Sequence, residues 1–348
     1  MKYVERRLKQ KFSKLLDINK KMDDMNLENV KRILFFKVEL KIGEYVVGSF
    51  IFREIKRRYP DIKIDVFVGG TEEIKEFLKH NPHIDSYDVF NRKDFFEKFR
   101  KTQKILKKSK GKSYDILFDL SGEKVVSPKQ LIFMRKINAR VNIGYDKDNY
   151  KIYNRKVLNQ KGRMVDIWGK MLKKMGIKEA DLSYEIPFSE SSERRIDEFF
   201  KEKGIGENIA INFFGSVEDR KINVKNAVTI IKKLTEFYPE HSIVVLDSPS
   251  DRNEINEILN NIEKGKIHYY KDSRTIMDAV SIIKRSDLVV SPDTSIVHIA
   301  EGLNKKILAF YENNEENFEK NRIYENSKII IYDKTINGID YENIDYSL

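Results

Sequence analysis

Residues 32–38 read RILFFKV, a short apolar run that is typical of a strand buried on both faces. The sequence LKIGE at residues 40–44 predicts a turn, and helical periodicity then runs over residues 45–59 until Pro60 ends it. A second apolar run, IKIDVFV, occupies residues 62–68. A strand, a helix and a strand at this spacing predict two parallel strands joined by a crossover helix.

The same alternation extends along most of the chain. Further strands are expected at residues 87–90, 114–120, 141–143, 208–214, 242–247, 267–270, 287–291 and 306–311, with helices between them. The alternation is interrupted between residues 170 and 190, where we place the junction between two Rossmann-like domains, over 30–178 and 179–333. An extension over 1–29 precedes them, and a tail over 334–348 follows. The predicted fold class is α/β: two α/β/α domains whose parallel sheets face a cleft, with ligands beyond the carboxyl ends of the strands.

Composition limits the class of protein. The chain has 348 residues, and 66 Lys and Arg against 55 Asp and Glu give a net charge of +11, which favours phosphorylated ligands, membrane headgroups or nucleic acid as partners. The absence of cysteine excludes disulfides, thiol nucleophiles and cysteine metal sites. No apolar stretch approaches the ~18 residues of a membrane span, and the N-terminus lacks an apolar signal core. We therefore expect a cytoplasmic protein, soluble or peripherally attached to the membrane.

Two segments are strongly basic. Apolar residues at helical spacing over residues 3–16 predict a basic amphipathic helix, which is either an extension docked on the domain or partly disordered, or an anchor on an anionic membrane surface. Residues 98–112 hold eight Lys or Arg. That run is either a solvated helix face or a patch for lipid phosphates or nucleic acid.

The segment SPDTSIVHIAEGL at residues 291–303 follows an apolar strand and opens a helix. Asp293, Thr294 and Ser295 suit the first turn of a helix, where side-chain oxygens cap free amides and where a phosphate can bind. The alternative is a capped helix without a ligand. His298 lies one turn into the helix, either packed against the sheet or turned toward the cleft to donate to a phosphate or sugar oxygen.

Two other loops also follow predicted strands. The strand NIAINFF at residues 208–214 leads into Gly215-Ser216 and then Arg220 and Lys221, which either neutralise a pyrophosphate or lie on a solvated surface. After the first strand, Glu44 is either a carboxylate favoured by a helix dipole or a general base.

The remaining motifs are weak. The chain has no G-x-G-x-x-G fingerprint, no phosphate-binding P-loop, no G-x-S-x-G elbow and no H-E-x-x-H motif. Asp146 and Asp148 have the D-x-D spacing of metal-dependent sugar transferases, but they lie in a polar stretch, so a metal site is not expected.

Three motifs in this order resemble glycosyltransferase family nine, the lipopolysaccharide heptosyltransferases and their relatives. Residues 33–44 resemble the family's opening strand and Ile-Gly-Asp turn, and Gly215-Ser216 with Arg220 and Lys221 is similar to its glycine-small turn and phosphate-binding lysine. Residues 291–303 are similar to its Asp-Thr-Gly-x-x-His-x-x-x-x-Leu segment. The resemblance covers roughly residues 30–311.

The resemblance implies the GT-B fold, in which the N-terminal Rossmann-like domain lies on the acceptor side and the C-terminal one binds the nucleotide-sugar donor. It also implies an inverting, metal-independent transfer of a sugar to a lipopolysaccharide or another surface glycan. Characterised members transfer heptose from ADP-heptose. The resemblance implies no cofactor besides the nucleotide-sugar co-substrate, with an ADP-linked one favoured, and a lipid-linked acceptor at the inner face of the cytoplasmic membrane. Glu44 would be the catalytic base. The donor-binding residues would be Gly43, Gly215, Ser216, Arg220, Lys221, Asp293, Thr294, Ser295 and His298.

The chain departs from the family pattern at several of these positions. Glu44 stands where the family usually has Asp, Ser295 replaces its Gly, and Ile222-Asn223 replaces its Trp-Pro. The family's Gly-Pro-Thr after the last strand is also absent. Alternative functions are a nucleotide-sugar epimerase of GT-B fold and a nucleotide-sugar-binding homologue that has lost catalysis. The net charge of +11 leaves a nucleic-acid binder as a third alternative, but the sequence has no recognised nucleic-acid-binding module, and no nucleic-acid partner is expected.

Overall fold

The chain forms two compact units. The computed structural model describes residues 13–21, 27–91, 94–111, 114–122, 124–158, 161–215, 217–263, 265–323 and 326–348. Unit 1 comprises the residues up to Lys41 together with Gly48–Ser183, and unit 2 comprises Ile42–Val47 and Tyr184–Leu348. Each unit is described separately, and the cleft expected between the two sheets stays a prediction.

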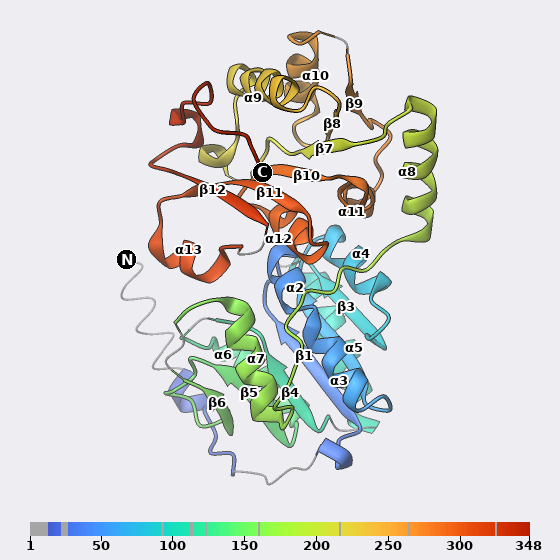
Figure 1. The fold of residues 1–348 in the computed structure, drawn as a ribbon. Helices are drawn as coiled ribbons and strands as arrows, with labels where there is room; N and C mark the ends of the chain where they lie inside the picture. The colour runs from blue at the N-terminus through green and yellow to red at the C-terminus, as the bar shows by residue number, and fades with distance from the viewer. Residues whose placement is uncertain are drawn as a thin grey trace. The chain divides into compact units, whose positions relative to one another are not determined.

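Unit 1 is built on a six-stranded parallel sheet with the strand order β3-β2-β1-β4-β5-β6, and helices flank the sheet (Figure 1). Its strands are β1 (Arg32–Lys37), β2 (Lys63–Gly69), β3 (Ser86–Phe90), β4 (Ile116–Asp119), β5 (Val141–Tyr145) and β6 (Arg155–Val157). Its helices are η1 (Leu27–Asn29), α3 (Phe50–Arg58), α4 (Glu72–His80), α5 (Phe95–Gly111), α6 (Pro128–Ile137) and α7 (Met164–Met175). Helix α2 (Ile42–Gly48) links the two units, since all but its last residue belong to unit 2.

Unit 2 repeats the same topology, with the strand order β12-β11-β10-β7-β8-β9 and parallel pairing throughout. Its strands are β7 (Asn208–Ile211), β8 (Ser242–Val245), β9 (Ile267–Tyr269), β10 (Leu288–Pro292), β11 (Lys306–Glu312) and β12 (Ser327–Tyr332). Its helices are α8 (Glu190–Lys203), η2 (Glu218–Arg220), α9 (Val224–Phe237), α10 (Arg252–Asn260), α11 (Ile276–Arg285), α12 (Ser295–Gly302), α13 (Glu315–Asn321) and η3 (Ile336–Gly338). The predicted class of two Rossmann-like domains is confirmed.

A close contact between a glycine and an indole fixes the start of α3 in unit 1. A Cβ atom placed on Gly48 would lie 1.7 Å from Cζ3 of Trp168, whose side chain is only 1% exposed. Only glycine, which has no side chain, allows the backbone to approach the ring this closely. The helix expected over residues 45–59 is divided into α2 and α3 only at Ser49, whose backbone angles are still helical, and α2 begins at Ile42, inside the expected turn.

The described part of the N-terminal extension docks on unit 1. The Ser13 hydroxyl donates to the carbonyl of Val126 at 2.6 Å, and the Asp17 carboxylate accepts from the amides of Lys151 and Ile152 at 2.7 and 2.9 Å. Of the amphipathic helix expected over residues 3–16, only residues 13–16 fall within the described residues, and these four are helical. The Ser13 hydrogen bond and the packing of Leu16 against the core of unit 1 hold this turn in place.

The C-terminal segment completes the core of unit 2. Tyr341 and Tyr346 are 2% and 0% exposed and belong to the same apolar cluster as Phe310 of β11. The Tyr346 hydroxyl donates to the carbonyl of Tyr341 at 3.0 Å, and the Tyr238 hydroxyl donates to the carbonyl of Tyr346 at 2.9 Å. The residues expected to form a tail thus contribute side chains to the hydrophobic core.

Four elements were not expected from the sequence: β6, α8, β12 and α13. Helix α8 is rich in charge, and its buried Ile196, Phe199 and Phe200 give the only apolar face. Strand β6 has three residues, too few for a period-two pattern, and β12 is an edge strand that stays partly exposed over most of its length. Strands β6 and β12 are the edge strands of their sheets and α8 packs on α11, so these elements depend on tertiary contacts that a local pattern does not show.

We expect Tyr346→Ala to lower the free energy of unfolding of unit 2 by about 3–5 kcal/mol, because it leaves a cavity in a closed core. Tyr346→Phe should cost only about 1 kcal/mol, the contribution of one hydrogen bond. Urea titration followed by circular dichroism measures both. Ile331→Ala, at a side chain that is 54% exposed, is the control and should change little. Equal stability of Tyr346→Ala and the wild type would contradict the core assignment.

Candidate functional site

The candidate site lies at the carboxyl ends of β7 and β10, the point in unit 2 where the strand order reverses. The two strands pair directly, but the chain leaves β7 toward β8 on one side and leaves β10 toward β11 on the other. In open parallel sheets, such a switch point leaves a crevice that binds ligands. Two of the predicted motifs follow these two strands, at residues 212–221 and 291–303.

The first turn of α12 is built by side-chain caps. The Thr294 hydroxyl accepts the amide of Ile296 at 3.2 Å, and the hydroxyls of Ser291 and Thr294 lie 3.1 Å apart. The Asn212 amide nitrogen, just beyond β7, donates to the Ser291 hydroxyl at 3.0 Å and to the carbonyl of Phe214 at 3.1 Å. The sequence analysis missed Asn212, although a polar residue within the otherwise apolar run NIAINFF is a visible signal.

Arg220 brings the second and third motifs together. Its Nη1 donates to Oδ2 of Asp293 at 3.0 Å, and its Nη2 lies 3.4 Å from Oε2 of Glu312. The Gly215 amide donates to the Arg220 carbonyl at 3.1 Å, and a Cβ on Gly215 would lie 2.5 Å from Cβ of Arg220. Gly215 is therefore required for the tight loop that places this guanidinium beside the start of α12.

Asp293 is 8% exposed, and two side chains compensate the cost of burying its charge. In addition to Arg220, the Nδ2 of Asn317 on α13 donates to its Oδ2 at 2.9 Å. Within the described residues, Oδ1 of Asp293 accepts no hydrogen bond. Asn317 is a second residue that the sequence analysis missed, because it lies in a helix that no local pattern indicated.

Lys221 faces a different partner. Its Nζ donates to Oδ1 of Asp251 at 2.7 Å and lies 3.6 Å from Oε2 of Glu218. Burial opposes ionisation of Asp251, but hydrogen bonds from Lys221, Ser250 and Ser248 outweigh it and lower the pKa of this carboxyl. The hydrogen bond from Lys221 in turn raises the pKa of the lysine. Arg220 and Lys221 thus have separate environments, and of the two only Arg220 contacts the loop before α12, through Asp293.

His298 packs against the start of α2. A Cβ on Gly43 would lie 3.0 Å from Cδ2 of His298 and 3.8 Å from Cα of Ser295, so glycine permits the close approach of the two helices. His298 is 5% exposed, and its Nδ1 has no hydrogen-bond partner in the described part of the chain. Burial lowers the pKa of His298, and the charge of Asp293 only partly opposes this effect.

The other predicted site residues give less information. Glu44 lies in the first turn of α2 and is partly buried, and its role as a base stays a prediction. Ser216 lies outside the described residues. Among the residues that are described, no group of three or more His, Cys, Asp or Glu could hold a metal ion. Between Asp146 and Asp148, the buried Lys147 donates to the carbonyl of Ser121 at 2.7 Å.

Comparisons with known proteins identify the family and agree with the fold. The model of glycosyltransferase family 9 (heptosyltransferase) matches residues 102–341. Lipopolysaccharide heptosyltransferase 3 of Escherichia coli is 23% identical over 77% of this chain and 80% of that protein. A glycosyl transferase family 9 structure from Veillonella parvula DSM 2008 superposes with a TM-score of 0.70 at 15% identity, over 87% of this chain and 86% of that one. The E. coli heptosyltransferase WaaC with ADP superposes with a TM-score of 0.65 at 15% identity, over 86% and 93%.

Two Rossmann-like units and a capped helix at a topological switch point define an α/β protein of the GT-B class. Since the family model matches more than half of its length, the chain belongs to glycosyltransferase family 9 and is a glycosyltransferase.

We expect Gly215→Ala to lower the free energy of unfolding by about 1–3 kcal/mol, because the added methyl group meets the backbone of Arg220. Gly206→Ala, where an added Cβ has no neighbour within 4 Å, is the matched control and should be near neutral. Thermal or urea unfolding measures both variants. If the two alanine variants are equally stable, the loop does not depend on Gly215.

The lowered pKa of His298 predicts a pH-dependent stability. The unfolded chain takes up a proton near pH 6.5 that the folded chain resists, so this residue reduces stability as the pH falls below that value and has no effect above it. The stability lost between pH 7.5 and pH 5 should be smaller in His298→Gln than in the wild type. Urea titrations at both values test this, with His241→Gln as the control, and an unchanged loss in His298→Gln would contradict it.

Proposed function

We propose that this glycosyltransferase transfers a heptose from an ADP-linked donor to a lipopolysaccharide or another surface glycan, with inversion and without a metal ion. Family membership supports sugar transfer from a nucleotide donor. The heptose and the ADP come from the relatives: one is named a lipopolysaccharide heptosyltransferase, and a superposable structure is described with ADP. The observation that carries the proposal is the Arg220–Asp293 pair at the start of α12.

The start of α12 suits the donor pyrophosphate. The free amides and the dipole of a helix N-terminus attract anions, and Thr294 and Ser295 occupy the N-cap and first helical positions. Arg220 lies beside this turn with a guanidinium that has five N–H donors, more than its contacts with Asp293 and Glu312 use. These groups would stabilise the negative charge that develops on the departing nucleoside diphosphate.

Asp293 would orient the donor sugar. Arg220 and Asn317 hold its Oδ2, which leaves Oδ1 to accept a hydrogen bond from a sugar hydroxyl. Because both partners fix the carboxylate before the donor binds, little side-chain entropy would be lost on binding. Lys221, paired with Asp251, would contribute to the electrostatic field rather than contact the diphosphate.

The transfer itself would be a direct displacement. Glu44 would take the proton of the acceptor hydroxyl as its oxygen attacks the anomeric carbon, while the bond to the diphosphate breaks on the opposite face. The transition state would carry oxocarbenium character, as in glycoside hydrolysis. His298 stays neutral near pH 7, since burial lowers its pKa, and it would act as a hydrogen-bonding group rather than as a cation.

The acceptor and the cellular location are parts of the same proposal. If the acceptor is lipid-linked, the enzyme would act at the inner face of the cytoplasmic membrane. The chain would then be a cytoplasmic protein that binds this face peripherally. Among the described residues, no helix combines the length and the hydropathy that crossing a bilayer requires.

We expect Arg220→Ala to weaken ADP binding by about 10- to 100-fold, since a hydrogen bond to a charged group contributes about 1.5–3 kcal/mol. Lys221→Ala should weaken it less, because Lys221 donates to Asp251, whereas Arg220 lies beside Asp293 at the start of α12. Isothermal titration calorimetry measures both, with the exposed Lys225→Ala as the control. If Lys221→Ala has the larger effect, Lys221 rather than Arg220 is the diphosphate contact.

Glu44→Gln should keep ADP affinity but reduce turnover with ADP-heptose and a lipopolysaccharide acceptor by about 10²- to 10⁴-fold, the usual contribution of a general base. Coupled detection of released ADP measures the rate, and excess EDTA should leave the wild-type rate unchanged. Full turnover in Glu44→Gln would exclude Glu44 as the base. Conversion of the donor without an acceptor would indicate an epimerase, and ADP binding without turnover on any acceptor would indicate a non-catalytic homologue.

A further inference from the structure

The net charge of the chain is concentrated in its first half. Residues 1–183 contain 44 Lys and Arg against 25 Asp and Glu, a net charge of +19. Residues 184–348 contain 22 against 30, a net charge of −8. The overall value of +11 thus hides two halves of opposite sign. The half predicted to bind a nucleotide donor is acidic, so the excess of lysine and arginine in unit 1 has another cause.

One of the most basic stretches of unit 1 includes β6 and α7. Residues 151–178 hold nine Lys and Arg and a single acidic residue, Asp166. Lys170, Lys173 and Lys174 lie on α7 and are exposed, as are Lys161 before the helix and Lys178 after it. Like charges on one helix repel one another and cost stability, so their accumulation is better explained by an anionic partner than by folding.

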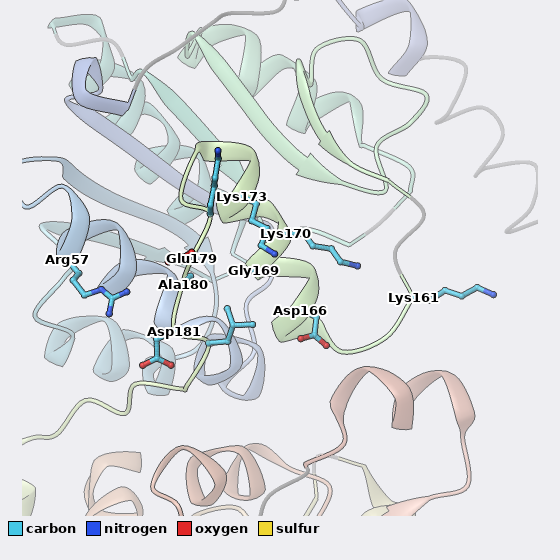
Figure 2. Close-up of a pocket in the computed structure, with 11 residues that line it drawn as sticks. Arg57, Lys161, Asp166, Gly169, Lys170, Lys173, Glu179, Ala180 and Asp181 are labelled. Carbon is cyan, nitrogen blue, oxygen red and sulfur yellow. The ribbon is translucent and has the colours of Figure 1, made fainter.

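These side chains border a groove in the surface of unit 1. The groove has a volume of about 700 Å³ and lies between α7, the end of α3 and residues 178–182. Lys170 and Lys173 project from α7, Arg57 comes from α3, and Lys161 comes from the segment before α7 (Figure 2). Lys178 also lines the groove. All of the lining residues belong to unit 1, whereas α12 and the loop before it belong to unit 2.

Arginines already neutralise two of the carboxylates in the groove. Asp166 lies 3.2 Å from Nε of Arg163, and Asp181 lies 3.4 Å from Nη2 of Arg53. Neither of these arginines lines the groove. In contrast, Lys161, Lys173 and Lys178 form no ion pair within the part of the chain that the structure describes. The groove therefore presents unpaired ammonium groups to solvent, despite the acidic side chains in its wall.

The side chains that line the groove indicate the class of ligand that it binds. Among the described residues, no aromatic side chain lines the groove, whereas proteins that bind single-stranded nucleic acid stack bases on aromatic rings. Flexible lysines without a backbone cradle suit phosphates whose positions vary, as in the headgroups of a fluid leaflet. Leu158, at the end of β6, is 45% exposed and adds an apolar side chain to the same stretch. Basic side chains beside exposed apolar groups are typical of surfaces that bind anionic membranes.

We propose that the groove along α7 binds the phosphate groups of anionic lipid headgroups and so docks unit 1 on a membrane surface. Lys161, Lys173 and Lys178 are the principal contacts. This site needs neither the donor nor the catalytic residues, and its lining includes none of the described residues of the N-terminal extension. The groove specifies the surface for the peripheral membrane binding in the proposed function and rests on that part of it, but binding is measured without any substrate and so apart from sugar transfer.

The test is sedimentation of the full chain with lipid vesicles. One set is phosphatidylcholine alone, and the other contains about 30% phosphatidylglycerol, which makes the surface strongly anionic. The wild type should bind only the anionic vesicles, and binding should weaken with salt. The triple variant Lys161→Glu, Lys173→Glu, Lys178→Glu should bind at least about a hundredfold more weakly, since each lysine near an anionic leaflet contributes roughly a factor of five. These side chains are exposed, so the unfolding transition should be unchanged.

The matched control is Lys225→Glu, Lys232→Glu, Lys271→Glu, which makes the same change in net charge at exposed lysines of unit 2 and should bind like the wild type. Equal loss of binding in both triple variants would show that only overall charge matters and would overturn the site. So would retained binding in the groove variant, or binding of inorganic phosphate or of a single-stranded RNA in place of vesicles. Loss of sugar transfer with normal vesicle binding would instead count against the proposed function alone.

Discussion

The side-chain amide of Asn212 links the two strand ends on which the candidate site depends. It donates to the Ser291 hydroxyl and to the carbonyl of Phe214, so the loop after β7 and the loop after β10 are held in one arrangement. Thr294, 3.1 Å from Ser291, is thereby fixed as the cap of α12. A buried amide whose partners are all satisfied rigidifies its surroundings, because any displacement would leave a polar group unpaired away from water.

At the candidate site, the carboxylate of Asp293 is the common partner of Arg220 and Asn317. Both side chains donate to this buried carboxylate, and Arg220 could not reach it without the tight loop at Gly215. Lys221, the next residue, turns to Asp251 and enters a separate network. Adjacent basic residues in a sequence therefore have different environments, and only their hydrogen-bond partners distinguish a ligand contact from a structural ion pair.

Local pattern predicted the regular part of the fold well. The apolar runs in β1, β2, β10 and β11 are buried on both faces, as parallel strands require. Of the three residues expected to suit the start of the helix in the motif at residues 291–303, Thr294 is the N-cap of α12. The same reasoning missed β12 and α13, since an edge strand and a short polar helix have little periodicity. Asn317 was missed with α13, because its role arises only from a contact with Asp293 that is remote in sequence.

The packing of Trp168 against Gly48 has a practical consequence. Trp168 is the single tryptophan of the chain, it is buried, and both residues belong to unit 1. Its intrinsic fluorescence therefore reports the state of one unit only, whereas backbone ellipticity reports both. When the two signals change at different denaturant concentrations, the units unfold separately, and the order in which they lose structure can be read from a natural chromophore without any label.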